Sequence, residues 1–190
     1  MINKVALKIT DYIQKNGNIK NTDDLEKINC SLQAIFNEVF KVVILIILFF
    51  IIGKINYFLF SVLILFSIRI FTGGYHCNTT IKCLFYSILL FLVSCLIGSI
   101  LPKLNSSVYY ITALISIFIV ILRTPYPNKN RPIKNKKRKR IFKIISTLFT
   151  IFWVCILLFY IKDITYLNCG FLTIVLQVIQ LIYIKKGVNQ

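Results

Sequence analysis

Acidic residues and histidine are scarce in this sequence. Its 190 residues include six Asp and Glu and a single histidine, and no Cys-x-x-Cys pair occurs among its six cysteines. A zinc site is therefore not expected. No Asp or Glu lies between residues 39 and 162, which argues against a carboxylate proton relay, a carboxylate metal site or an aspartyl protease. We accordingly expect neither a metal nor another cofactor.

The polar surface of a soluble domain is also missing. The chain is 57% hydrophobic with a mean hydropathy of +0.78, which is more apolar surface than so small a domain can bury, so the sequence predicts an integral membrane protein. In a soluble protein the net charge of +17 would suggest nucleic acid. Here we interpret it as a determinant of topology and a contact for anionic membrane lipid, and no nucleic-acid partner is expected. The first 20 residues lack the apolar segment of a signal peptide, so insertion through the first span is expected.

Helical periodicity and long apolar runs predict the fold class, an all-α membrane protein. Two amphipathic helices are predicted over residues 1–16 and 22–38, at the cytoplasmic face of the membrane. The six membrane-spanning helices predicted after them cover residues 39–52, 55–70, 81–101, 108–122, 141–161 and 166–184. The chain thus divides into an N-terminal peripheral segment, 1–38, and a six-span membrane domain, 39–190. Within the third span, Gly98 is expected at a close helix contact.

The distribution of basic residues predicts the orientation. An even number of spans puts both termini on one side of the membrane, together with 20 of the 23 basic residues. The positive-inside rule assigns that side to the cytoplasm. A polar segment between spans two and three, residues 69–83, and a basic segment, residues 123–140, fall on the same side. This orientation places Cys83 in a reducing compartment, where a free thiol persists.

The polar segment 69–83 admits two interpretations. It contains the only histidine, His76, together with Cys77, Cys83 and the pair Gly73-Gly74. One interpretation is a polar turn between membrane helices, anchored at the interface by a basic residue near each end. The other is a Cys–His nucleophilic site.

Local geometry favours the nucleophilic site. The glycine pair is expected to break the helix entering from the second span, and a new helix starting near Asn78 would place Cys83 in its second turn. In one straight helix the Cα atoms of His76 and Cys83 would lie about 10.5 Å apart, which is unsuited to a direct hydrogen bond. The glycine break lets His76 fold back over the helix start, as a Cys–His pair requires. The positive charges of Arg69 and Lys82 also favour a thiolate.

The basic segment 123–140 has two interpretations as well. It holds three of the four prolines, so its first half is expected to be extended and stiff. Ten basic residues lie between residues 123 and 143. They predict either a cytoplasmic anchor on anionic lipid or a docking surface for an acidic peptide.

These motifs together resemble one known family, the accessory gene regulator protein B (AgrB) peptidases of Gram-positive quorum sensing. The residues that carry the resemblance are Arg69, Gly74, His76 and Cys83, then Ser-Leu-Gln at 31–33 with Asn37 and Lys41, and finally Pro125 with Asn-Lys-Asn-Arg-Pro-Ile at 128–133. Length, span layout and charge pattern agree too, so the resemblance covers nearly the whole chain. It departs at Ile70, which is basic in some relatives, and at Tyr126, where small residues are frequent; both leave substrate choice open.

The resemblance implies a cysteine endopeptidase at the cytoplasmic face of the bacterial plasma membrane. Such an enzyme removes the acidic C-terminal tail of a small propeptide and helps close the remainder into a thiolactone or lactone autoinducer. Cys83 would be the nucleophile and His76 the general base. The residues expected to bind substrate or support the site are Arg69, Gly73, Gly74, Gln33, Asn37, Lys129 and Arg131. The expected partners are the propeptide and anionic lipid, and a homodimer is left open.

The supporting residues also have purely structural interpretations. Arg69 either binds a substrate carboxylate or anchors the end of a span by snorkelling. Gln33, Asn37 and Asn78 are candidates to orient His76 or to contribute to an oxyanion hole. For Gln33 and Asn37 the alternative is core or interfacial hydrogen bonding.

Two other classes of protein compete with the enzyme. A small transporter would need polar residues inside its spans, and apart from scattered Ser and Thr the sequence offers only Gln177 and Gln180. A non-catalytic membrane scaffold would carry an inert thiol at Cys83.

Overall fold

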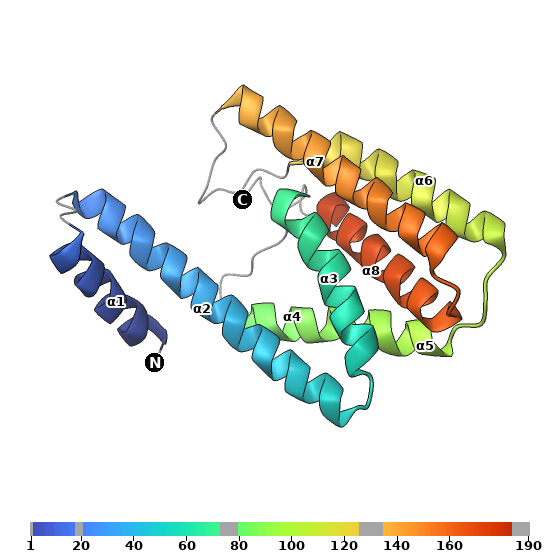
Figure 1. Ribbon diagram of the computed structural model, residues 1–190, viewed down its shortest axis with the longest axis horizontal. Coiled ribbons are helices and arrows are strands. Elements are labelled where there is room, and N and C mark those ends of the chain that lie inside the picture. The colour runs from blue at the N-terminus through green and yellow to red at the C-terminus, as the bar shows by residue number, and fades with distance from the viewer. Residues whose placement is uncertain (1, 18–20, 73–79, 126–134, 184–190) are drawn as a thin grey trace. The chain divides into compact units, whose positions relative to one another are not determined.

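Every regular element in the described part of the chain is helical. The computed structural model describes residues 2–17, 21–72, 80–125 and 135–183 (Figure 1). The elements are α1 (Ile2–Asn16), α2 (Thr22–Ile51), α3 (Ile55–Thr72), α4 (Thr80–Leu92), the π-helical turn η1 (Val93–Ile97), α5 (Gly98–Ile100), α6 (Ser106–Arg123), α7 (Lys136–Cys155), the π-helical turn η2 (Ile156–Tyr160) and α8 (Ile164–Tyr183).

Most of these helices have the length and composition of membrane spans. Five stretches are long and apolar enough to cross a membrane, namely Asp24–Ile51, Ile55–Thr72, Ser106–Arg123, Lys136–Tyr160 and Ile164–Ile182. A sixth apolar helix, Leu84–Ile100, is shorter. Large apolar side chains such as Phe66, Leu114 and Phe159 are 65–70% exposed, as expected for surfaces that face lipid rather than water. The chain is thus an all-α membrane protein, while the count of six spans and the cytoplasmic termini stay predictions.

Contacts divide the chain into two units, Met1–Ile52 and Gly53–Gln190, and each is described by itself. In the first unit the amphipathic helix α1 packs along α2. The helix α2 runs for 30 residues without a break, so it joins the predicted second amphipathic helix to the first predicted span. The predicted boundary between the peripheral segment 1–38 and the membrane domain 39–190 falls inside α2. It marks where the chain would enter the membrane, so it stays a prediction.

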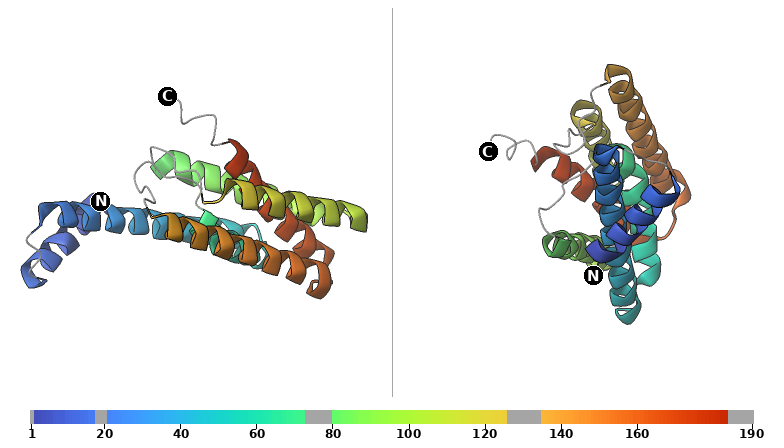
Figure 2. Two further views of the ribbon diagram at one scale, coloured as in Figure 1. Left: turned by 90° about the horizontal axis from the view of Figure 1, so that it is seen from above. Right: turned by 90° about the vertical axis from the view of Figure 1, so that its left-hand side faces the viewer.

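The second unit is built around α8. This helix contacts α3, α6, α5 and both π-helical turns (Figures 1 and 2). More than half of the apolar stretch of α8 is buried (56%), but at most a third of the corresponding stretches of α3, α6 and α7 is buried (33%). The buried apolar core of this unit comprises Ile64, Ile68, Tyr109, Ala113, Val120, Trp153, Val154, Leu157, Leu167, Phe171, Ile174, Val178 and Leu181. The central helix α8 therefore packs through apolar side chains against the surrounding helices and fixes where their ends lie.

The rod formed by α4, η1 and α5 meets α8 at a glycine. A Cβ added at Gly98 would lie 2.7 Å from Cys169 Sγ and 2.9 Å from the Cys169 backbone nitrogen. Side chains essentially never approach backbone so closely, so only glycine allows this contact. The predicted close-packing role of Gly98 is confirmed. One residue earlier on α8, Asn168 Nδ2 donates to the Leu101 carbonyl at 2.9 Å and Asn168 Oδ1 accepts from the Tyr109 hydroxyl at 2.5 Å.

The helix α7 begins earlier than predicted. Its N-cap is Asn135, whose Oδ1 accepts from the backbone nitrogen of Lys137 at 2.9 Å. This cap and the good helix propensity of Lys and Arg extend the helix beyond its apolar part. The basic segment predicted to be a loop up to residue 140 is therefore helical from Lys136 onward.

We predict that Gly98→Ala destabilises the second unit. The new methyl group must push α8 away or displace Cys169, which should lower the free energy of unfolding by about 1–3 kcal/mol. Reversible unfolding in detergent micelles measures the effect. The neighbouring change Ser99→Ala removes only a hydroxyl that bonds the Leu96 carbonyl within its own helix, and it should cost about 0.5 kcal/mol or less. Equal losses for the two variants would contradict the close contact.

Candidate active site

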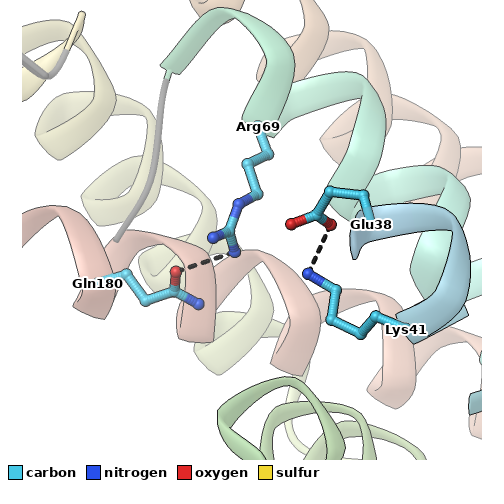
Figure 3. A network of polar contacts seen from close by, with 4 residues as sticks. All are labelled: Glu38, Lys41, Arg69 and Gln180. Carbon is cyan, nitrogen blue, oxygen red and sulfur yellow. Dashed lines mark hydrogen bonds and ion pairs between the residues drawn. The ribbon is translucent and has the colours of Figure 1, made fainter. Parts of the chain in front are cut away.

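Two hydrogen bonds join the last turn of α3 to α8. Arg69 Nη1 donates to Gln180 Oε1 at 3.2 Å (Figure 3), and Gln177 Nε2 donates to Thr72 Oγ1 at 3.0 Å. Both pairs are spaced by three residues on each helix, so they lie on facing stripes. Thr72, Gln177 and Gln180 are at most 2% exposed. We call these four residues the α3–α8 polar ladder.

The contact with Arg69 fixes the orientation of the Gln180 side chain. A guanidinium carries only donors, so the carboxamide must turn its oxygen toward Arg69. Gln180 Nε2 then faces away from the guanidinium (Figure 3), and it is buried without a hydrogen-bond partner among the described residues. At the end of α6, two further buried atoms, Arg123 Nη1 and Thr124 Oγ1, lack a partner in the same ranges. Several buried polar atoms at this end of the second unit thus have no hydrogen-bond partner among the described residues.

The predicted nucleophile lies near the start of α4. The described part of α4 begins at Thr80, and Cys83 is its fourth residue. The described part of α3 ends at Thr72, immediately before the glycine pair that was predicted to break it. The other predicted site residues of this segment and of the basic segment lie outside the described residues; they are Gly73, Gly74, His76, Asn78, Lys129 and Arg131. Their roles, and that of Cys83, stay predictions.

The predicted supporting residues of the first unit, Gln33 and Asn37, share one face of α2 with Lys41, a residue of the motif that carries the family resemblance. Gln33, Asn37 and Lys41 follow one another at intervals of four residues, so they lie above one another along the helix. Gln33 Nε2 donates to Asn29 Oδ1 at 3.2 Å, one turn earlier. Lys41 Nζ forms an ion pair with Glu38 Oε2 at 2.5 Å (Figure 3). The Gln33 bond thus lies within α2 itself, and the roles expected for Gln33 and Asn37 stay predictions.

Basic side chains crowd the N-terminal turns of α7. Residues 136–140 are all Lys or Arg and all exposed, and none forms an ion pair with a described residue. The positive end of the helix dipole disfavours cations at this position, and the five charges repel one another. An anionic partner would relieve both effects. We call this group the α7 basic cluster.

The sequence did not reveal the polar ladder. Gln177 and Gln180 were noted only as polar residues that a transporter would need, but in the structure both pair with side chains of α3. A usable signal was present, because polar residues within membrane spans are costly and usually face a partner or a site. The identity of the partners was hidden, since they lie more than 100 residues away in the chain.

Metal-binding potential is low in the described ranges. No group of three or more His, Cys, Asp or Glu side chains there is arranged to hold a metal ion. The described cysteines, Cys30, Cys95, Cys155 and Cys169, are all free thiols.

The helices and their polar ends define an all-α integral membrane protein. A sequence profile of the family Accessory gene regulator B (AgrB) matches residues 6–181 of the chain. The match covers nearly the whole sequence, so the chain belongs to the AgrB family.

Individual relatives agree with this assignment. The chain is 38% identical over 189 residues to an AgrB-like protein of Clostridium beijerinckii, which covers 99% of this chain and 92% of that protein. It is 29% identical over 153 residues to the accessory gene regulator protein B of Staphylococcus carnosus, with 80% and 77% covered. For the protein of the same name from Staphylococcus aureus strain MRSA252 the identity is 27% over 136 residues, with 70% and 72% covered. No solved structure matches the chain.

We predict that the hydrogen bond between Gln177 and Thr72 in the α3–α8 polar ladder stabilises the end of α3. Thr72→Val keeps the shape of the side chain but removes the oxygen that accepts from Gln177 Nε2, and it should cost about 1 kcal/mol of unfolding free energy or more. Thr72→Ser retains the hydroxyl and should lose about half as much or less. Denaturant titration in micelles compares the two variants with the parent. A serine variant as unstable as the valine variant would show that the lost methyl group, rather than the hydrogen bond, matters.

Proposed function

We propose that this protein is a membrane cysteine endopeptidase that removes the C-terminal tail of a small propeptide and promotes cyclisation of the remainder. The product would be a thiolactone or lactone peptide that serves as a quorum-sensing autoinducer. The observation that carries the proposal is the family match, because residues 6–181 include both His76 and Cys83 with the six-residue spacing of the AgrB peptidases. The proposal places the active site at the cytoplasmic face of the bacterial plasma membrane, where the positive-inside rule puts residues 69–83.

The chemistry uses one nucleophile and one base. His76 takes the proton of the Cys83 thiol, and the thiolate attacks the carbonyl carbon of the scissile peptide bond. The C–N bond then breaks, the new amino terminus of the tail takes the proton from His76, and the peptide is left as a thioester on Cys83. A thiol or hydroxyl within the bound peptide next attacks the thioester while His76 accepts its proton. Ring closure releases Cys83, which recovers the proton.

Cyclisation must compete with hydrolysis of the thioester. Exchange of a thioester for a thiolactone is close to energy-neutral, so it succeeds if water is excluded and the closing group is held near the carbonyl. A site at the membrane interface provides both conditions. No Asp or Glu lies between residues 39 and 162, so amide side chains such as Gln33, Asn37 or Asn78 are the candidates to orient His76 or stabilise the oxyanion.

Substrate recognition would rest on opposite charge. The α7 basic cluster is exposed and lacks ion pairs with described residues, which suits it to an acidic propeptide tail. Lys129 and Arg131, on the preceding segment, would extend the same surface. Anionic lipid is the competing partner of these charges.

Neutralising the α7 basic cluster should weaken processing. With all five residues of Lys136–Arg140 changed to Gln, the KM for an acid-tailed propeptide is expected to rise about tenfold at low salt, and added salt should erase most of the difference, because exposed charges are screened. Tail removal is measured by mass spectrometry in bilayers of neutral lipid, so that lipid charge plays no part. If KM is unchanged there but the variant inserts poorly into anionic membranes, the cluster is only an anchor.

The catalytic pair makes a separate prediction. Cys83→Ala and His76→Ala should each abolish tail removal without lowering expression, and the double variant should be no worse, because the two residues act as one unit. A propeptide lacking its ring-closing side chain should still be cleaved by the parent protein. Its acyl group should then accumulate on Cys83 as a hydroxylamine-sensitive adduct, or leak slowly to the linear acid. Continued cleavage by Cys83→Ala would show that the nucleophile is assigned wrongly.

A further inference from the structure

We propose that Gln180 of α8, held in place by Arg69 of α3, is a substrate-binding residue whose Nε2 donates a hydrogen bond to a carboxylate of the acidic propeptide tail. This inference rests on the proposed function and adds to it a binding residue that lies in the last helix, far in sequence from the segments expected to contact the peptide.

The first support is the state of the Gln180 side chain. It is 2% exposed, its oxygen accepts from Arg69 Nη1 at 3.2 Å, and its Nε2 is buried without a partner among the described residues. The amide cannot satisfy Nε2 by turning over, because that would bring an N–H group against the guanidinium. A buried donor that no neighbour satisfies is unfavourable, and a ligand oxygen would remove the deficit.

The second support is the imbalance of donors and acceptors at this end of the second unit. The C-terminal ends of α3, α6 and α8 lie toward the same end of the bundle (Figures 1 and 2), and Arg123 Nη1 and Thr124 Oγ1 at the end of α6 are also buried without described partners. The only acidic residue between residues 53 and 190 is Asp163. Its carboxylate caps the opposite end of α8, where Oδ1 accepts from Thr165 N at 2.7 Å.

These observations favour a carboxylate over other ligands. Among the described residues nothing supplies an acceptor to Gln180 Nε2, so an acceptor atom of a bound molecule would satisfy it. A carboxylate matches the Arg69 charge as well as the Gln180 donor, and hydrogen bonds of this kind to a charged acceptor are stronger than neutral ones. The acidic tail is the part of the proposed substrate that offers such groups.

The test measures binding in a chain that cannot cleave. In the Cys83→Ala background, purified in neutral detergent, the probe is a fluorescein-labelled synthetic peptide rich in Asp and Glu, followed by fluorescence anisotropy. Gln180→Glu keeps an oxygen for Arg69 but replaces the donor by an acceptor, and it should raise the Kd about tenfold or more. Gln180→Met removes the donor without adding charge, and should raise the Kd about threefold to tenfold. A matched peptide with Asn and Gln in place of the acids should bind all three proteins alike.

A buried hydroxyl of the same helix supplies the control. Thr173 is fully buried, and its Oγ1 donates to the Cys169 carbonyl at 2.8 Å, so Thr173→Val alters α8 without touching the ladder and should leave the Kd within about twofold of the parent. The inference fails if Gln180→Met binds the acidic peptide as tightly as the parent. It also fails if both Gln180 variants lose the neutral peptide equally, or if they differ from the parent only when phosphatidylglycerol is added, since lipid would then be the ligand. Cleavage that persists in Cys83→Ala would instead overturn the proposed function.

Discussion

Polar groups inside a lipid-embedded bundle have only one another as partners, and in the second unit α8 brings most of them together. Asn168 forms hydrogen bonds to the Leu101 carbonyl after α5 and to Tyr109 in the first turn of α6. Thr173 donates to a carbonyl of its own helix, and Gln177 and Gln180 bond side chains at the end of α3. Because each of these side chains would be costly to bury alone, the position of α3 follows from its match to α8. In the sequence, the glycine pair that precedes the proposed catalytic histidine begins one residue after Thr72, the last α3 residue of that match.

The shortage of acids gives the protein an unusual electrostatic design. A soluble protein with 23 basic and six acidic residues would repel itself, but here the membrane and, under the proposed function, an acidic substrate would supply the counter-charge. The α7 basic cluster forms no ion pair with a described residue, and buried donors at the ends of α6 and α8, Arg123 Nη1 and Gln180 Nε2, have no described partner. Under the proposed function, substrate recognition and membrane topology would depend on the same basic residues.

The sequence predicted those features that follow from local composition. The second and fourth predicted spans, 55–70 and 108–122, agree with α3 and α6 within two residues at each end, because hydropathy marks where the chain meets lipid. The start of α7 was missed, since its first turns are charged and are helical through a cap. The pairing of Arg69 with Gln180 could not be predicted either, because 111 residues separate them and only packing around α8 brings them together. The pairing of His76 with Cys83 stays a prediction from spacing and resemblance.

The length of α2 has a mechanical consequence. Its 30 residues extend over about 45 Å, whereas the hydrocarbon core of a bilayer is about 30 Å thick. A helix without a hinge transmits tilt undiminished, so turning its apolar half by about 20° would swing its first residue, some 25 Å away, through about 9 Å. Gln33 and Asn37, two residues of the stripe Gln33, Asn37 and Lys41, lie on the part of α2 that would swing. Bilayer thickness, which sets the tilt, would therefore act on the stripe directly, as a mechanical input that needs no ligand.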